Sequence, residues 1–330
     1  MQPRTLIRIK TCAVIAAGIL PLANFAGAQS PAASPWPFAT PAPQATLPPL
    51  SGMADTGGEP PRDIPLVEKA WDDLSNKEVG EDGQLALKIK PEEWKHAETD
   101  NFILHYRRIT EARKVAREIE YDLWFVAKSL GATPDQYRRK KSHVFIFKDE
   151  TEWGKFLVST NAPLWAASFA RYDELFLNIR NTDSGEPFDS HVLAHETTHA
   201  VVARLYPYEH WPVWLNEGFA EYMGSASVAT RNHQTIKSKQ GTLQNADMPL
   251  DELFALRVYP QDQDKVWQLY QTGEKFVRFL MNELPKDRFR KFVTDLLVTK
   301  DAKQSLITVY GDKFKDFDAF EKKFEAFSTK

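Results

Sequence analysis

The sequence predicts an α+β protein, in which a half built from strands and helices precedes a half built from helices. Two observations lead to this prediction. Strand-like stretches alternate with helical patterns up to about residue 210, and beyond residue 251 the apolar residues recur at helical spacing. The chain has 330 residues, of which 42% are hydrophobic and 12% aromatic, and this composition excludes a wholly disordered protein.

The first 28 residues have the pattern of a secretory signal peptide. Three basic residues near the start precede an apolar run, which ends in the small residues Ala-Gly-Ala at 26–28. An uncleaved membrane anchor is the alternative, but Pro21 and Asn24 interrupt the run, which leaves too few apolar residues for a span of about 20. We therefore expect export to the periplasm or the cell exterior, cleavage before Gln29, and no stable membrane insertion afterwards.

Residues 29–62 are predicted to be a disordered linker. Nine of them are prolines, and alanine, serine, threonine and glycine fill most of the gaps, so the segment cannot bury a core. A docking tail for a partner in the cell envelope is the alternative. The folded part is then residues 63–330, with a strand-and-helix half (63–210) and a helical half (211–330).

Charge and cysteine content limit which ligands the protein can bind and which cross-links it can form. The formal net charge is −3, and removal of a leader with three basic and no acidic residues makes it −6, so no basic field attracts nucleic acid. The one cysteine, Cys12, lies in the expected leader. The mature chain can therefore form neither disulfides nor a cysteine-ligated zinc site, and a metal would need histidine and carboxylate ligands.

The elements of the first half follow from periodicity. Residues 63–98 show no clear pattern. After them we expect a strand at 101–106, a helix ending at Leu130 with Gly131 as a left-handed cap, a strand buried on both faces at 142–148, a helix at 150–159, and strands at 166–171 and 174–180 that turn at Tyr172 and Asp173.

The second half is predicted to contain helices at 264–283 and 286–298, after a shorter apolar pair at 253–254. In the terminal stretch, phenylalanines recur at helical spacing and form one apolar stripe, made of Phe314, Phe317, Phe320, Phe324 and Phe327. We interpret this stripe as core packing against the strand-and-helix half. A helix that binds a partner or a membrane is the alternative.

Residues 195–199 have the sequence H-E-T-T-H and lie in an apolar-periodic helix predicted at 190–205. Because residues four apart share one face of a helix, His195 and His199 can bind the same tetrahedral metal ion. Glu196 lies at the edge of such a site, where it can take a proton from a water bound to the metal. The alternative is a pair of solvated histidines beside a surface charge.

A catalytic metal site of this kind needs a third protein ligand. Glu217 lies in the stretch 211–223, for which we predict a second helix with Pro212 in its first turn and Gly224 at its end. Packed antiparallel on the first helix, it brings Glu217 beside both histidines. The aromatic neighbours of Glu217 favour a cationic partner for its carboxylate, and the alternative is the charged face of an amphipathic helix.

Glu221 follows Glu217 by four residues and lies on nearly the same helix face. Histidines that bind a metal usually donate their other ring N–H to a carboxylate or carbonyl. We therefore expect Glu221 to orient His195. The alternative is an ordinary solvated carboxylate.

The H-E-x-x-H motif, followed by W-L-N-E-G-F-A at 214–220, resembles the gluzincin clan of zinc metallopeptidases. The resemblance implies a zincin-like fold with a mixed sheet and one Zn²⁺ per chain. It implies His195, His199 and Glu217 as ligands. It also implies Glu196 as general base. Residues 100–325 look like the compact bacterial peptidase-MA-like domains, and no G-x-M-E-N motif of aminopeptidases precedes the zinc helix, where residues 177–180 occupy the corresponding edge strand.

In this clan a tyrosine or histidine from a later helix, in a Y-x-x-G setting, often stabilises the oxyanion of the transition state. Residues 270–273 are Y-Q-T-G, so the resemblance points to Tyr270 as that donor. A core aromatic is the alternative. His210 and His233 are weaker candidates, and we expect both at the surface.

The motifs and the resemblance together predict an exported zinc metallopeptidase that acts on a peptide or protein substrate. Its cleft would run between the two halves, past the strand at 174–180. A catalytically silent binding or scaffold module of the envelope, with a structural zinc site, is an alternative from a different class. A zinc hydrolase acting on another bond has the same site and also stays open.

Overall fold

A computed structural model describes residues 59–327, apart from 139, 165, 180–187, 208 and 235–246. The expected leader, its Cys12 and nearly all of the linker lie outside the described residues. Within the described part of the chain, no helix combines the length and the apolar character that crossing a membrane requires.

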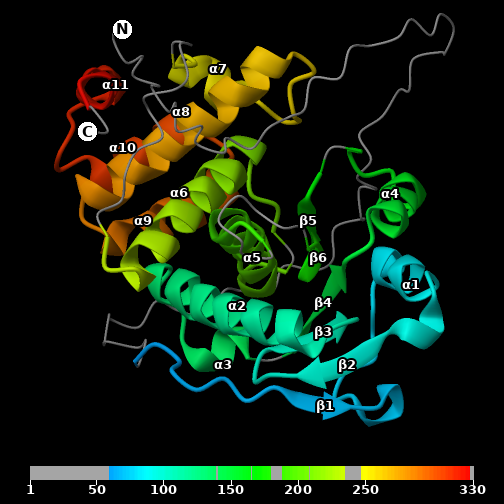
Figure 1. Cartoon of the computed structure of the whole chain (residues 1–330). Coiled ribbons are helices and arrows are strands. Elements are labelled where there is room, and N and C mark those ends of the chain that lie inside the picture. Colours follow the sequence, from blue (N-terminus) through cyan, green and yellow to red (C-terminus); the bar gives the residue numbers. More distant parts are fainter. Residues whose placement is uncertain are drawn as a thin grey trace, which may run out of the picture.

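A six-stranded mixed sheet runs through the first half, in the order β1-β2-β3-β4-β6-β5 (Figure 1). Strands β3, β4 and β6 are parallel, and the other neighbours pair antiparallel. Strands β3 to β6 fall where the sequence predicts strands, whereas β1 and β2 come from the segment without a clear pattern. The bounds are β1 Val67–Lys69, β2 Lys95–Glu98, β3 Phe102–Tyr106, β4 Ser142–Phe147, β5 Ser168–Arg171 and β6 Glu174–Asn178.

The larger core lies on one face of the sheet. Val144 and Leu175 point from neighbouring strands into this core, which α2 (Ile109–Ser129) and α5 (Ser190–Leu205) cover. Helix α2 ends as the sequence predicts, because Gly131 follows it with a left-handed φ of 62°. The predicted range of α5 is confirmed, and this helix carries the H-E-x-x-H motif.

A smaller, aromatic core lies on the opposite face. Phe145 and Phe147 pack there under α4 (Glu150–Ser159), with α1 (Glu81–Leu87) beside them. Since Phe145 follows Val144 in the same strand, β4 is buried on both faces, as predicted.

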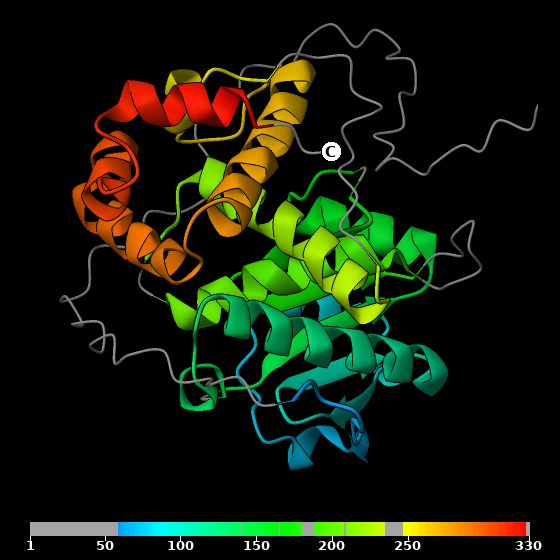
Figure 2. The same ribbon diagram turned by 90° about the vertical axis from the view of Figure 1, so that its left-hand side faces the viewer.

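The helices that follow α6 (Val213–Arg231) lie on its far side from the sheet, as the yellow-to-red ribbons show (Figures 1 and 2). Phe320 and Phe324 of the terminal helix are buried against Phe276 and Phe279. The phenylalanine stripe therefore packs in the core as predicted, but its partners belong to the helical half and not to the strand-and-helix half. The bounds are α3 Pro134–Tyr137, α6 Val213–Arg231, α7 Leu250–Ala255, α8 Gln263–Asn282, α9 Asp287–Thr299, α10 Ala302–Tyr310 and α11 Phe317–Glu325, with short 3-10 turns at Trp71–Asp73 and Pro91–Glu93.

The prediction that the strand at 174–180 lies at the edge of the sheet is wrong. Residues 174–178 form β6, which lies inside the sheet and pairs with β4 on one side and β5 on the other. Strand β5 is the edge on this side of the sheet, and its side chains are only half-buried, whereas those of β6 are all buried. A hairpin pattern predicts two paired strands but does not reveal which of them faces the rest of the sheet.

The predicted end of the second helix at Gly224 is also wrong, because α6 continues to Arg231. A Cβ atom at Gly224 would lie 3.0 Å from the carbonyl oxygen of His191 in α5. The glycine therefore permits close packing of two helices in place of terminating one. At the other end, Pro212 is the cap residue, and the first helical residue is Val213.

Three histidines form a hydrogen-bonded row across the smaller core. Nδ1 of His96 in β2 lies 2.8 Å from Nδ1 of His105 in β3, and Nε2 of His105 lies 2.9 Å from Nδ1 of His143 in β4. Burial lowers the pKa of all three rings, and the neighbouring imidazoles lower that of His105 further. The folded protein thus keeps this row neutral, with a pKa of about 4 at His143.

We expect acid to destabilise the fold through this row. An unfolded histidine binds a proton below its pKa of 6.5, whereas folded His143 stays neutral down to about pH 4. The neutral state of His143 contributes on the order of 3 kcal/mol to the free energy of unfolding. This contribution is complete above pH 6.5 and is lost as the pH falls towards 4. Denaturant unfolding from pH 7.5 to 4 should show a shallower pH slope for His143→Gln than for the wild type.

The matched control is His210→Gln, because His210 is exposed. Its pH slope should equal that of the wild type. Equal slopes for the wild type and His143→Gln would contradict the prediction.

Candidate metal centre

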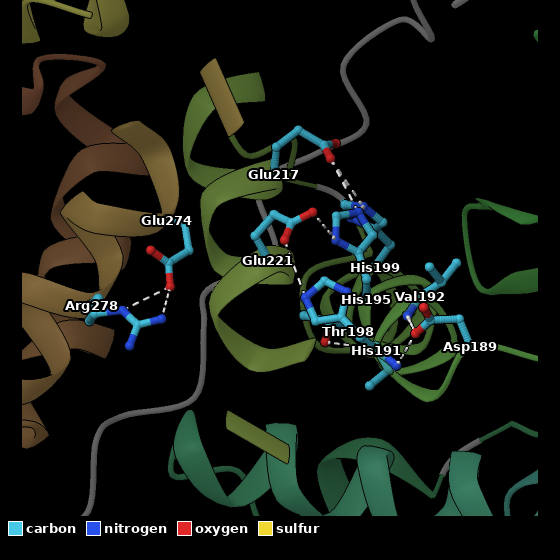
Figure 3. A network of polar contacts seen from close by, with 11 residues as sticks. Asp189, His191, Val192, His195, Thr198, His199, Glu217, Glu221, Glu274 and Arg278 are labelled. Atoms are coloured by element: carbon cyan, nitrogen blue, oxygen red, sulfur yellow. Dashed lines mark hydrogen bonds and ion pairs between the residues drawn. The ribbon is translucent and has the colours of Figure 1, made fainter. Parts of the chain in front are cut away.

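Helices α5 and α6 pack antiparallel and bring three predicted ligands together. His195 and His199 of α5 and Glu217 of α6 offer ligand atoms that all lie within 4.8 Å of one another (Figure 3). The order of contacts shows the antiparallel packing, since His191 meets Glu221 while His199, two turns later, meets Glu217. The sequence prediction of an i, i+4 pair facing a carboxylate agrees with this geometry.

The separations of the ligand atoms fit a tetrahedral ion. The two Nε2 atoms of His195 and His199 are 3.1 Å apart, and they lie 3.3 and 3.6 Å from Oε2 of Glu217. A tetrahedral zinc ion bound at about 2.0–2.1 Å would hold its ligand atoms roughly 3.3–3.4 Å apart. The residues therefore fit a single metal ion without rearrangement of the backbone.

The electrostatics of the cluster favour a cation. Burial raises the pKa of Glu217, but His199 and His195 outweigh burial, so the pKa lies well below its usual value and the carboxylate is charged. Burial lowers the pKa of His195, but the bond to Glu217 and the charge of Glu221 raise it to about 9. A metal ion would take the place of that proton, so metal binding should release it.

Glu221 lies near His195, as predicted, and it also contacts His191. Its Oε1 lies 3.6 Å from Nδ1 of His195, and its Oε2 lies 3.2 Å from Nε2 of His191 (Figure 3). The first distance is longer than a hydrogen bond, so Glu221 acts on His195 mainly through charge. Sequence reasoning missed His191, although it lies one turn before His195 on the same face of the helix.

Glu196 faces the edge of the sheet. Its side chain is half-buried, and the backbone N–H of Ala170 in β5 is among its partners. Burial raises the pKa of Glu196, and the charges of His195 and His199 oppose this shift. A carboxylate with a raised pKa is suited to accept a proton and to return it.

Tyr270 lies beside the cluster, as the motif predicts. Its ring centroid is 6.2 Å from that of His195. Burial and the nearby charge of Glu217 raise the pKa of Tyr270 well above its usual value. The hydroxyl therefore stays protonated and can donate a hydrogen bond. His210 and His233 are exposed, as expected.

Two glycines set the distance between α6 and α8. A Cβ atom on Gly218 would lie 2.4 Å from the backbone carbonyl of Gly273, so the two helices cross in direct backbone contact. Gly218 directly follows Glu217, and Gly273 lies one turn after Tyr270. The crossing thus explains why glycines accompany both residues and how Tyr270 comes so close to Glu217.

Tyr259 is a contact that sequence reasoning missed. It lies between α7 and α8, and its hydroxyl donates a hydrogen bond of 2.5 Å to Oε1 of Glu217. The two residues are separated by 42 positions, and no periodicity or motif links them. Only the fold brings this phenol to the cluster.

Comparison with protein-family models and with curated proteins found no match for this chain. The fold and the cluster themselves therefore define the class of this protein. The chain is an α+β protein with a mixed sheet and a buried His-His-Glu group that is compatible with a bound metal ion.

We expect Gly218→Ala to disrupt the centre, because the new methyl group would meet the backbone of Gly273. The free energy of unfolding should fall by about 1–3 kcal/mol, the usual range for overpacking. Metal content after saturation should fall as well, because α6 carries Glu217. Denaturant unfolding and metal analysis of the purified protein measure both effects.

Gly154→Ala in α4 is the matched control, since no described atom lies within 4 Å of its added Cβ. This change should stabilise the helix by about 0.5–1 kcal/mol. A Gly218→Ala variant that is as stable and as metal-loaded as the control would contradict the prediction.

Proposed function

We propose that this chain is an exported, zinc-dependent metallopeptidase of the gluzincin type, with a zincin-like fold and peptides or proteins as substrates. One observation carries the proposal: His195, His199 and Glu217 converge at separations that suit one tetrahedral ion, with Glu196 adjacent. This donor set, two imidazoles and a carboxylate, is typical of catalytic zinc in peptidases.

The number of donors favours a catalytic site over a structural one. Structural zinc sites are closed by four protein ligands, whereas catalytic sites keep one position open. Among the described residues, the cluster contains three ligand residues. The partial exposure of Glu196 further supports access to the centre from outside.

The proposed mechanism assigns separate tasks to the side chains. Zinc, when bound by His195, His199 and Glu217, would acidify water and polarise a substrate carbonyl. Glu196 accepts the proton of the attacking water and returns it to the leaving amine. Tyr270 donates its hydroxyl proton in a hydrogen bond to the oxyanion that develops on the substrate.

The proposed path of the substrate runs along β5. Extended peptides bind proteins by adding a strand to an exposed sheet edge. Strand β5 is that edge and packs beside α5, and Ala170 within it lies next to Glu196. A peptide paired with β5 would present its backbone carbonyls next to the cluster.

Glu196→Gln should separate catalysis from metal binding. The amide cannot accept a proton, so hydrolysis should fall by about 10²–10⁴-fold while zinc content stays at one per chain. Glu217→Ala should instead lower zinc content, because it removes a ligand. A peptide-library digest read by mass spectrometry, with and without chelator, measures cleavage, and metal analysis measures zinc.

The control is Glu92→Gln, at an exposed position in a 3-10 turn, which should cleave like the wild type. Wild-type activity in Glu196→Gln would end the assignment. Zinc binding without any chelator-sensitive cleavage would favour the silent envelope module, and cleavage of another bond would favour a different hydrolase.

Tyr270→Phe should lower kcat by about 10²–10³-fold, the usual effect of removing one oxyanion donor. KM should change little, because the hydroxyl acts on the transition state. Steady-state kinetics on a cleaved library peptide measure the two constants. An unchanged kcat, or a loss confined to KM, would contradict this role for Tyr270.

A further inference from the structure

The two carboxylate oxygens of Glu217 have different partners. Oε2 faces the Nε2 atoms of His195 and His199, at 3.3 and 3.6 Å. Oε1 accepts the hydrogen bond of 2.5 Å from the hydroxyl of Tyr259. One oxygen is thus directed at the metal position, and the other is held by a phenol.

This division matters because a carboxylate can bind one metal ion through one oxygen or through both. Binding through both oxygens would occupy the position that a catalytic site keeps open. A hydrogen bond at Oε1 engages that oxygen and fixes the rotation of the carboxylate. Partners of this kind tune both the geometry and the affinity of a metal site.

We propose that Tyr259 is a positioning residue that keeps Glu217 a one-oxygen ligand and thereby leaves one coordination position of the metal open. The inference rests on the metal site of the proposed function and not on peptide cleavage. It assigns Tyr259 a task separate from that proposed for Tyr270, whose ring centroid lies 6.2 Å from that of His195 and whose hydroxyl also lies near Glu217 and Tyr259.

The surroundings of Glu217 suit this task. A phenol hydroxyl carries one hydrogen, which Tyr259 donates to the carboxylate. Glu217 itself is only 2% exposed, so water is poorly placed to supply the same hydrogen bond.

The segment that carries Tyr259 is anchored at both ends. On one side, Arg257 donates to the carbonyl of Phe254 in α7 at 2.7 Å. On the other, the carboxylate of Asp262 caps α8 by accepting from the N–H of Lys265 at 2.9 Å. Tyr259 is 43% exposed as a residue while its hydroxyl reaches buried Glu217, so removal of the hydroxyl alone leaves the core packing intact.

The test compares Tyr259→Phe with the wild type in the full-length protein. Zinc affinity is measured by competition with a chromogenic chelator, and thermal unfolding without metal checks the fold. We expect unchanged unfolding and a Kd for Zn²⁺ that rises about 10- to 100-fold, the usual effect of losing a partner of a metal ligand. The control is Tyr310→Phe in α10, whose buried hydroxyl has no hydrogen-bond partner among the described residues.

A second readout reports the coordination mode. With Co²⁺ in place of zinc, four-coordinate sites absorb visible light more strongly than five-coordinate ones. The absorption should weaken in Tyr259→Phe and stay at the wild-type level in Tyr310→Phe. A wild-type Kd together with a wild-type cobalt spectrum in Tyr259→Phe would overturn the inference. A wild type that binds no zinc would overturn the metal site as well, and cleavage assays do not enter either outcome.

Discussion

The negative charge of Glu217 constrains the centre of the molecule, because a carboxylate removed from water destabilises the fold unless other groups replace the lost hydration. His195 and His199 face one of its oxygens, and Tyr259 occupies the other. These partners come from α5 and from the segment before α8, while the carboxylate belongs to α6. Three separate stretches of chain must therefore meet at one point for the charge to be tolerated.

Backbone contact between helices makes that meeting possible. Helix α6 lies between α5 and α8, with Gly224 against the first and Gly218 against the second. A glycine inside a helix costs about 1 kcal/mol relative to alanine, and here it permits approaches that no side chain would allow. On its other side α8 is held by the phenylalanines of α11, such as Phe320 and Phe324. Small residues thus set the distances at the centre, and large ones hold the frame around it.

The same fold keeps histidines in two opposite states. Burial alone disfavours the charged form of any imidazole, and it lowers the pKa of His105 and His143 in the smaller core. His195 is also buried, yet Glu217 and Glu221 raise its pKa to about 9. The position of carboxylates, and not burial, decides the difference. The charged cluster therefore lies between α5 and α6, whereas the neutral imidazoles lie beside the aromatic rings on the opposite face of the sheet.

The sequence by itself determined what depends on residues within one or two turns: the range of α5, the shared face of His195 and His199, and the burial of β4 on both faces. Glu217 follows from the antiparallel packing expected of two neighbouring helices, whereas Tyr270 follows from a motif, which records a spatial relation found in other proteins. Only the tertiary structure decided that β5 is the edge of the sheet, that Gly224 lies inside a helix, and that His191 and Tyr259 join the cluster. These outcomes depend on which distant segments pack together, and that choice is made by the summed burial and packing of the whole core, which no local pattern contains.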